Sequence, residues 1–339
     1  MGSDHAFGQL VLLNRVLRYR VGADGVKWTS TPASNSEVLS VAQALERATS
    51  SPKTSQDSVD QVARRAGNLL LGDLPSGSGP MILEADPLLG NLPWPAVESA
   101  SGPLGLHFDL QETPSLLLAS RAETSWPKGG HPLIVGASPD SEEGNALPEV
   151  LQEAAEVARF GHNPTVLVSG EATEAHVIAY LGSAETIHFA GHAIQQDGSA
   201  RLLLAPSSVS RMGGSLYLDS ALLRRYPPRA ARLAVLSACS TGKRNEGWNH
   251  GVADIVDTLA SLNVPEVVAT RWQIDSAASV PLMDAFYSGL AKGLTVPQAL
   301  TAARISLTSQ SRYRHPFFWA ASYASGWGRS DLRDVFHSF

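Results

Sequence analysis

The fold and the chemistry of this chain depend on one stretch: Arg232-Leu233-Ala234-Val235-Leu236-Ser237-Ala238-Cys239-Ser240-Thr241-Gly242. An apolar run that ends in small turn residues is typical of a buried strand in a parallel sheet. Cys239 would then stand at the carboxyl end of that strand, where open α/β sheets bind their ligands. Cys239 is also the single cysteine of the chain. No internal disulfide can form, which favours a reducing, cytoplasmic location.

Composition limits the classes of partner. Hydrophobic residues make up 43% and charged residues 17% of the chain, as in ordinary globular proteins. The net charge of −6 argues against direct binding of nucleic acid, which needs a concentrated basic face. The sequence has no apolar run of about 18 residues, so no membrane span is predicted. The opening residues Met1–His5 lack a signal-peptide pattern and resemble an artificial start, so we expect a piece of a longer protein.

Residues 5–125 predict an α/β unit without a catalytic constellation. The run 9–21 predicts one long strand or a hairpin. A helix is predicted after an amino-terminal cap at Ser58, and Gly72 is suited to end it. Asp, Glu and His occur in this segment, but not at the spacing of a ligand site. We therefore expect a non-catalytic, supporting half of the protein.

Residues 126–339 alternate between predicted strands and helices. Helices are expected between most of these strands, and a hairpin-like region is expected over 193–215. This alternation predicts an α/β domain whose mostly parallel central sheet is flanked by helices on both faces. The expected strands are 133–137, 165–168, 186–190, a strand from Leu233 that ends at Cys239, and 266–272.

The third of these strands ends at Gly191-His192, and the fourth ends at Cys239. Neighbouring parallel strands would present an imidazole and a thiol side by side. A histidine in reach can take the thiol proton, because the thiolate is the reactive form of cysteine, and can later protonate the leaving group. The backbone N–H groups of Ala193 and Cys239 would be suited to bind an oxyanion.

A structural interpretation stays open for each of these residues. A lone cysteine at a strand end is often a buried, inert thiol, and a lone histidine is often a hydrogen-bonded structural residue. His188 lies on the opposite face of its strand from Phe189, so we expect a supporting hydrogen-bonding role rather than a second base. No His, Cys and Asp cluster has zinc spacing, and we predict neither a metal nor a cofactor.

Further motifs accompany the two strand ends. Together the motifs are Thr186–Ala193, Leu236–Gly242, Val267–Asp275, His315–Ala320, Leu88–Ala96 and Pro114–Leu117. They resemble the CHAT family of caspase-like cysteine peptidases, which are related to separase. The resemblance implies a caspase-like domain over 126–339, preceded by a pseudo-caspase-like α/β half over 5–125. It also implies that His192 is the general base and Cys239 the nucleophile of an endopeptidase that cleaves a specific protein substrate.

The resemblance further implies a substrate that pairs as an added strand along Val268–Ile274. Trp272 would wall a side-chain pocket, and Asp275 would supply charge for a basic substrate residue. Alternatively, Trp272 is plain core and Asp275 caps the following helix. Gln273 and Ser276 depart from acidic positions common in the family. The residues predicted to contact substrate are Arg271, Trp272, Gln273 and Asp275.

The family resemblance also implies regulation. Relatives are often fused to, or switched on by, repeat domains, and several bacterial ones act in defence or regulated cell death. We therefore expect a protein substrate and an activating partner or fused repeat domain. Two other functions remain open: a catalytically silent interaction module on the same fold, and a small-molecule thiol acyltransferase, which would need a closed pocket.

Overall fold

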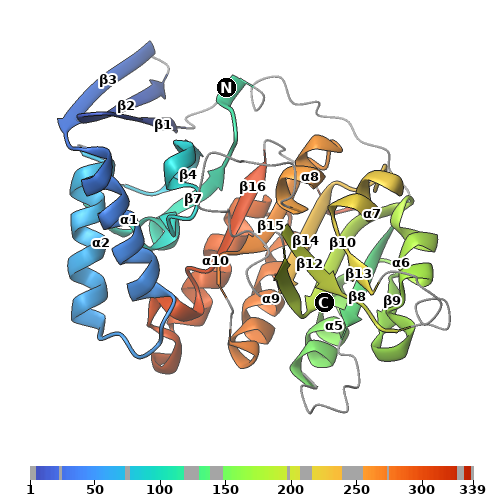
Figure 1. Cartoon of the computed structure of the whole chain (residues 1–339). Helices are drawn as coiled ribbons and strands as arrows, with labels where there is room; N and C mark the ends of the chain where they lie inside the picture. Colours follow the sequence, from blue (N-terminus) through green and yellow to red (C-terminus); the bar gives the residue numbers. More distant parts are fainter. Residues whose placement is uncertain are drawn as a thin grey trace.

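The computed structural model describes residues 5–22, 25–72, 77–117, 130–137, 148–196, 199–206, 216–238, 255–272, 275–326 and 332–336. Within these ranges, eleven strands form one sheet in the order β3-β2-β1-β4-β7-β16-β15-β14-β10-β8-β9 (Figure 1). The strands are β1 (His5–Leu12), β2 (Arg15–Gly22), β3 (Gly25–Pro32), β4 (Gly79–Glu84), β7 (Phe108–Glu112), β8 (His131–Ala137), β9 (Thr165–Val168), β10 (Ala184–Gly191), β14 (Leu233–Ala238), β15 (Glu266–Thr270) and β16 (Ser322–Gly326).

The predicted mostly parallel α/β sheet is confirmed. Strands β15, β14, β10, β8 and β9 form one parallel block. Strands β16, β7, β4 and β1 form a second parallel block, which meets the first at the antiparallel β15–β16 pair. The two outermost strands, β2 and β3, continue the second block as antiparallel neighbours.

The parallel block that contains β14 is buried on both faces. Leu233 and Val235 join a core with α5 (Pro148–Phe160), α9 (Ser276–Ala291) and α10 (Val296–Thr308). Ala234 and Leu236 point the other way, into a core with α6 (Glu174–Leu181), α7 (Ser220–Arg225) and α8 (Ile255–Ser261). Successive strand residues face opposite sides of a sheet, so a doubly covered strand needs a continuous apolar run. This need explains the sequence of β14.

The first segment contributes its own core. Residues 9–21 form the hairpin of β1 and β2, and helices α1 (Asn35–Thr49) and α2 (Gln56–Leu70) pack beneath it. The predicted cap at Ser58 is wrong. Ser55 caps α2 by accepting a hydrogen bond from the backbone N–H of Ser58, which lies in the first turn. Gly72 follows the helix with φ +60°, as predicted.

Short elements complete the first segment. These are η1 (Pro87–Leu89), η2 (Trp94–Ala96), the hairpin of β5 (Glu98–Ser99) and β6 (Gly102–Pro103), and α3 (Leu104–His107). The pairing of β7 with β16 joins residues 108–112 to residues 322–326. Both segments therefore contribute strands to one sheet, and a division into 5–125 and 126–339 stays a prediction.

The hairpin-like region predicted after His192 is a separate three-stranded sheet. It contains β11 (Ala193–Gln196), β12 (Ser199–Leu203) and β13 (Tyr217–Leu218). The predicted strand 266–272 ends earlier, at Thr270. The remaining short helical turns are η3 (Ser169–Glu171), η5 (Ser311–Tyr313) and η6 (Pro316–Phe318).

Candidate functional site

The site is built on the carboxyl ends of β10 and β14. These strands are parallel neighbours, and Gly191 pairs with Ala238 as the last residue pair of the ladder. His192 and Cys239 each come next along the chain, so the predicted meeting of the two strand ends is confirmed. Cys239 itself lies outside the described residues, and its role as nucleophile stays a prediction.

Gly191 fixes the end of β10 close to β8. A Cβ atom at this position would lie 2.6 Å from the carbonyl oxygen of Ala137. Real side chains do not tolerate such a contact with backbone, so a larger residue would push the strand end away. The partly exposed His192 is held on its other side, where its carbonyl oxygen accepts a 2.9 Å hydrogen bond from the N–H of Leu203.

Ala193 opens β11 and pairs with Leu202 of β12. The small sheet therefore begins immediately after the candidate general base, and it fixes the direction in which the chain leaves the site. The proposed oxyanion contact of the Ala193 N–H depends on the position of Cys239 and stays a prediction.

His188 lies in a buried polar network beneath this edge. Its Nδ1 is 3.0 Å from the hydroxyl of Tyr287 on α9, and its Nε2 is 3.1 Å from Oε1 of Glu153 on α5. The ring faces these helices, on the opposite side of β10 from Phe189. Burial, and secondly the nearby Glu153, raise the pKa of Tyr287 well above its usual value. His188 is thus placed to hold the strand, remote from bulk solvent.

The same network reaches the cysteine-bearing strand. Ser279 of α9 donates a hydrogen bond to Glu153, and its hydroxyl is 3.1 Å from that of Ser237. Ser237 lies on β14 two residues before Cys239. Buried polar groups are costly unless each finds a partner, so this chain of contacts favours one arrangement of the two strands and two helices. Hydrogen bonds from Ser237 through Ser279 to Glu153, together with the close approach of Glu153 to His188, therefore connect the supports of both candidate catalytic residues.

Two of the residues predicted to contact substrate, Arg271 and Trp272, make contacts within the protein. Arg271 is buried, pairs with Glu112 at 2.5 Å, and lies 3.9 Å over the ring of Tyr323. Trp272 is buried, and its Nε1–H donates to the carbonyl of Phe317 at 3.0 Å. All these contacts are internal to the protein. Gln273 lies outside the described residues.

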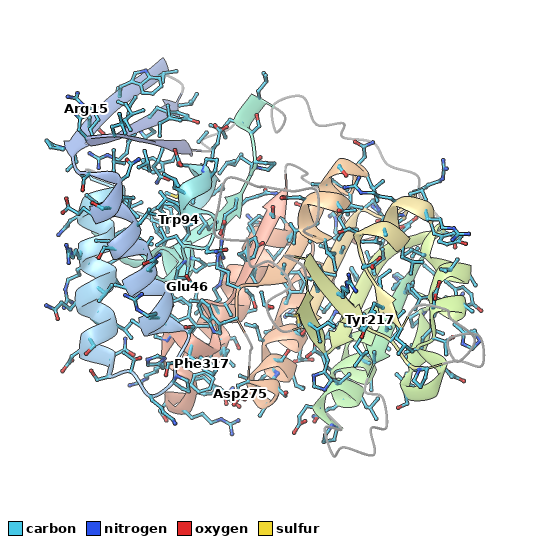
Figure 2. The ribbon with its side chains drawn as sticks, viewed as in Figure 1. Arg15, Glu46, Trp94, Tyr217, Asp275 and Phe317 are labelled. Atoms are coloured by element: carbon cyan, nitrogen blue, oxygen red, sulfur yellow. The ribbon has the colours of Figure 1, made fainter. Side chains whose placement is uncertain are left out.

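Asp275 caps α9, accepting a 3.0 Å hydrogen bond from the N–H of Ala278. The helix-cap alternative therefore describes its position. Figure 2 shows Asp275 and Phe317 at the same end of the molecule.

The predicted substrate track along Val268–Ile274 needs correction. Strand β15 lies between β14 and β16, and all five of its residues pair with β16. The N–H of Arg271 also donates to the carbonyl of Ala321. A substrate strand cannot add along Val268–Arg271, because the return of β16 already fills that side. Sequence reasoning does not predict the pairing of β16 with β15, because no strand is expected over residues 322–326.

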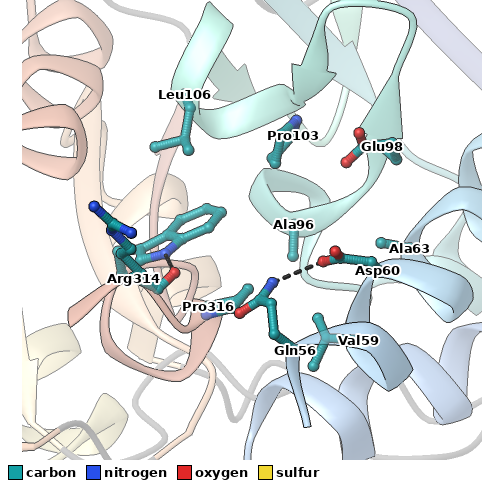
Figure 3. A pocket seen from close by; sticks show the side chains of 11 residues that line it. Gln56, Val59, Asp60, Ala63, Ala96, Glu98, Pro103, Leu106, Arg314 and Pro316 are labelled. Carbon is teal, nitrogen blue, oxygen red and sulfur yellow. Dashed lines mark hydrogen bonds between the residues drawn. The ribbon is translucent and has the colours of Figure 1, made fainter. Parts of the chain in front are cut away.

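A cavity of about 280 Å³ opens at the same edge of the sheet, and it was not foreseen (Figure 3). Strand β7 runs antiparallel to β15, so the residues that precede β7 lie beside the carboxyl end of β15. Burial, and then the carboxylate of Asp60, raise the pKa of Glu98 in this cavity. No local sequence motif predicts this cavity. It is lined by Gln56, Val59, Asp60, Ala63, Ala96, Glu98, Pro103, Leu106, Arg314, Pro316 and Trp319.

No three or more His, Cys, Asp and Glu residues in the described part of the chain are grouped so as to hold a metal ion. None of the helices described is both long and apolar enough to cross a membrane.

Comparisons with known proteins agree with this architecture. The family model described as the CHAT domain matches residues 40–327. The Arg-specific cysteine proteinase gingipain R has a similar structure, with a TM-score of 0.50 and 8% identity over 84% of this chain and 73% of that one. The complex of Porphyromonas gingivalis RgpB pro- and mature domains gives a TM-score of 0.49 and 9% identity, over 85% and 75% of the two chains.

No curated protein sequence matches significantly. The gingipain likeness shows the fold alone, which is the fold of caspase-like cysteine proteinases. The family model spans most of the chain, and its matched region contains both Gly191-His192 and Ala238-Cys239. The chain therefore belongs to the CHAT-domain family.

Proposed function

We propose that this protein is a cysteine endopeptidase with Cys239 as nucleophile and His192 as general base. The observation that carries the proposal is the parallel pairing of Gly191 with Ala238, which brings the residues before both groups to one sheet edge. Thiol chemistry needs an imidazole at such an edge, because the free thiol is mostly protonated at neutral pH.

In the proposed reaction, His192 takes the proton from Cys239, and the sulfur attacks the carbonyl carbon of the scissile peptide. Backbone N–H groups of Cys239 and Ala193 would stabilise the negative charge that develops on the carbonyl oxygen. The C–N bond then breaks, and the imidazolium gives its proton to the leaving amine. Water, deprotonated by His192, hydrolyses the thioester and restores the thiol.

The single cysteine allows a direct test, because a thiol reagent reports on Cys239 alone. We expect the pH dependence of iodoacetamide alkylation to have a midpoint below the value of about 8.5 for a free thiol. The His192→Gln variant should move that midpoint upward, whereas the exposed His176→Gln variant should not. Equal midpoints in native and urea-unfolded protein would contradict an activated thiol.

Proteolysis itself requires a second experiment. A proteome-wide cleavage profile of the wild type should contain products that are missing with Cys239→Ala, and both proteins should show the same circular dichroism. If an activating partner or a fused repeat domain is needed, products should appear only when it is added. A profile identical for the two proteins, with partner present, would favour a catalytically silent interaction module. We further propose that this endopeptidase acts in bacterial defence or regulated cell death.

A further inference from the structure

The outer face of the strands β1, β2 and β3 is an exposed apolar surface. The pairing register places Leu10 opposite Leu17, Tyr19 opposite Trp28, and Val21 opposite Val26. These side chains share one face of the sheet, since alternate residues of a strand point the same way. The exposed fraction is 43% for Leu10, 37% for Val21, 51% for Val26 and 55% for Trp28. Apolar side chains that gather in this way mark an interaction surface.

The opposite face of these strands packs on the helices through β1 and β2, so the outer face has no helix to cover it among the described residues. Phe7 and Val16 point inward, and they pack into the core formed with α1 and α2. Figure 1 shows the three strands projecting beyond these helices. The strands precede residue 40, where the match to the CHAT family begins. The outer face therefore lies outside the residues that the family model matches.

The surface is also ordered in advance. The rings of Tyr19 and Trp28 have centroids 5.0 Å apart, and the hydroxyl of Tyr19 donates to Glu84. Gly8 lies under Tyr19, because a Cβ atom at Gly8 would come within 2.2 Å of the tyrosine ring. Side chains held in this way lose little conformational entropy when a partner binds.

Strand β3 also offers backbone groups. It is the terminal strand of the sheet, pairs with β2 among the described strands, and is exposed along almost its whole length. Between Gly25 and Pro32 it contains neither a proline nor an irregularity in its register with β2. A regular edge of this kind is a template for an added strand, and its Lys27 and terminal Pro32 are residue types that disfavour pairing with an unmatched strand.

The charges indicate which strand would fit. The three strands contain Arg15, Arg18, Arg20 and Lys27 and no Asp or Glu, although the whole chain has a net charge of −6. Arg20 and Lys27 pair directly across the two outermost strands. The edge therefore presents cationic side chains, and acidic side chains on an added strand would complement them. We propose that the free edge of β3 binds an extended segment of a partner protein in which apolar and acidic residues alternate.

In this arrangement, the apolar residues of the partner would continue the surface past Val26 and Trp28. Its acidic residues would face the side that bears Lys27. A second copy of this chain is a poorer occupant, because its own β3 would bring another lysine and no acid to the edge. A membrane would cover the apolar face without pairing with the backbone of β3.

The test uses a fluorescent, capped peptide that alternates Val and Glu over about ten residues, the length of a long strand. Fluorescence anisotropy should show binding to the whole chain. Three control peptides should each bind at least about ten-fold more weakly, a loss that corresponds to about 1.4 kcal/mol. The controls replace Glu by Lys, place the same residues in two blocks, or carry N-methyl groups on alternate residues.

The protein variants separate charge from folding. Lys27→Glu should invert the preference from the Glu peptide to the Lys peptide, and the exposed Lys53→Glu should leave it unchanged. Trp28→Ser should weaken both peptides, and its circular dichroism should match the wild type because Trp28 is more than half exposed. Equal binding of the block or N-methyl peptide would overturn strand addition.

Two further measurements test the other possible occupants of the surface, a second copy of the chain and a membrane. Sedimentation should show a monomer at the protein concentration of the peptide assay. A dimer that Trp28→Ser dissociates would assign the surface to a second copy and overturn the proposal. Binding to vesicles of phosphatidylcholine and phosphatidylglycerol in equal parts, lost in Trp28→Ser, would assign it to a membrane and do the same. None of these readouts depends on the chemistry of Cys239.

Discussion

Strands β10 and β14 are held together differently at their two ends. At the amino end, the buried side chain of Arg232 pairs with Glu185 and also contacts Asp334 at 3.0 Å. Glu185 additionally accepts a 2.6 Å hydrogen bond from the N–H of Gly130. At the carboxyl end, contacts from Tyr287 to Ser237 run through His188, Glu153 and Ser279. An ion pair therefore anchors the amino ends of the two strands. A chain of buried polar contacts holds their carboxyl ends, beside the candidate catalytic residues.

The largest expected effect is at the anchored end. Arg232→Met would leave Glu185 as a buried carboxylate without its cation, and we expect a loss of about 3–5 kcal/mol in the free energy of unfolding. Urea titration followed by circular dichroism measures this loss. The double variant Arg232→Met, Glu185→Gln should recover part of it, because no lone charge remains. Protein that is still folded should alkylate Cys239 at the wild-type rate.

Glu153→Leu removes the polar contacts that support the carboxyl ends of β10 and β14. It should lower the free energy of unfolding less than Arg232→Met does. It removes the partner of both Ser279 and His188, and an unpaired buried polar group costs about 1–3 kcal/mol. Unlike the change at Arg232, it should also shift the pH dependence of Cys239 alkylation, because Ser237 and His188 lose their common support. If the two variants alter alkylation equally, the two ends do not differ in the way we infer.

Gly191→Ala sharpens the comparison on the catalytic side alone. The added Cβ would meet the carbonyl oxygen of Ala137 at 2.6 Å, so the end of β10 must move. We expect about 1–3 kcal/mol of destabilisation, typical of overpacking, together with slower alkylation of Cys239. The control is Gly170→Ala, where a Cβ atom would have no neighbour within 4 Å. Unchanged alkylation in a folded Gly191→Ala protein would argue against a positioning role for this glycine.

The smallest expected effect concerns pH. The pKa of Tyr287 is raised in the folded protein, so the unfolded chain loses its proton first as the pH rises. The stability that this neutral tyrosine contributes is complete below pH 10, the usual tyrosine value, and is lost as the pH rises above it. The free energy of unfolding should therefore fall less steeply above pH 10 in Tyr287→Phe than in the wild type. Tyr180→Phe, at an exposed tyrosine, should follow the wild type.

Local pattern predicted the elements that build the site. The apolar run before Cys239 and the short run before His192 both form buried parallel strands, because a doubly covered strand requires that composition. Helix starts were less certain. A serine three residues from the true cap has the same side chain, and only the hydrogen bond from the Ser58 N–H to the Ser55 hydroxyl identifies where α2 begins.

Long-range pairing could not be predicted in the same way. The ion pair of Arg271 with Glu112 joins residues 159 positions apart, and it occupies a side chain that the motif had assigned to substrate. The pairing of β16 with β15 likewise joins distant residues, and it occupies the expected substrate track over Val268–Arg271. The cavity of Asp60 and Glu98 likewise depends on elements from both halves of the chain. Each of these contacts follows from the sheet order, and no local spacing encodes it.

The position of β16 has a consequence for folding during synthesis. This strand comes after every other described strand of the sheet along the chain, yet it lies in the middle of the sheet and joins the two parallel blocks. Chains emerge amino terminus first, and pairings between distant segments form slowly. The two blocks can each collect their own helices early, but they cannot share one sheet until residues 322–326 arrive. A nascent chain would therefore contain every residue of the catalytic edge before it has the strand that fixes β15 in place.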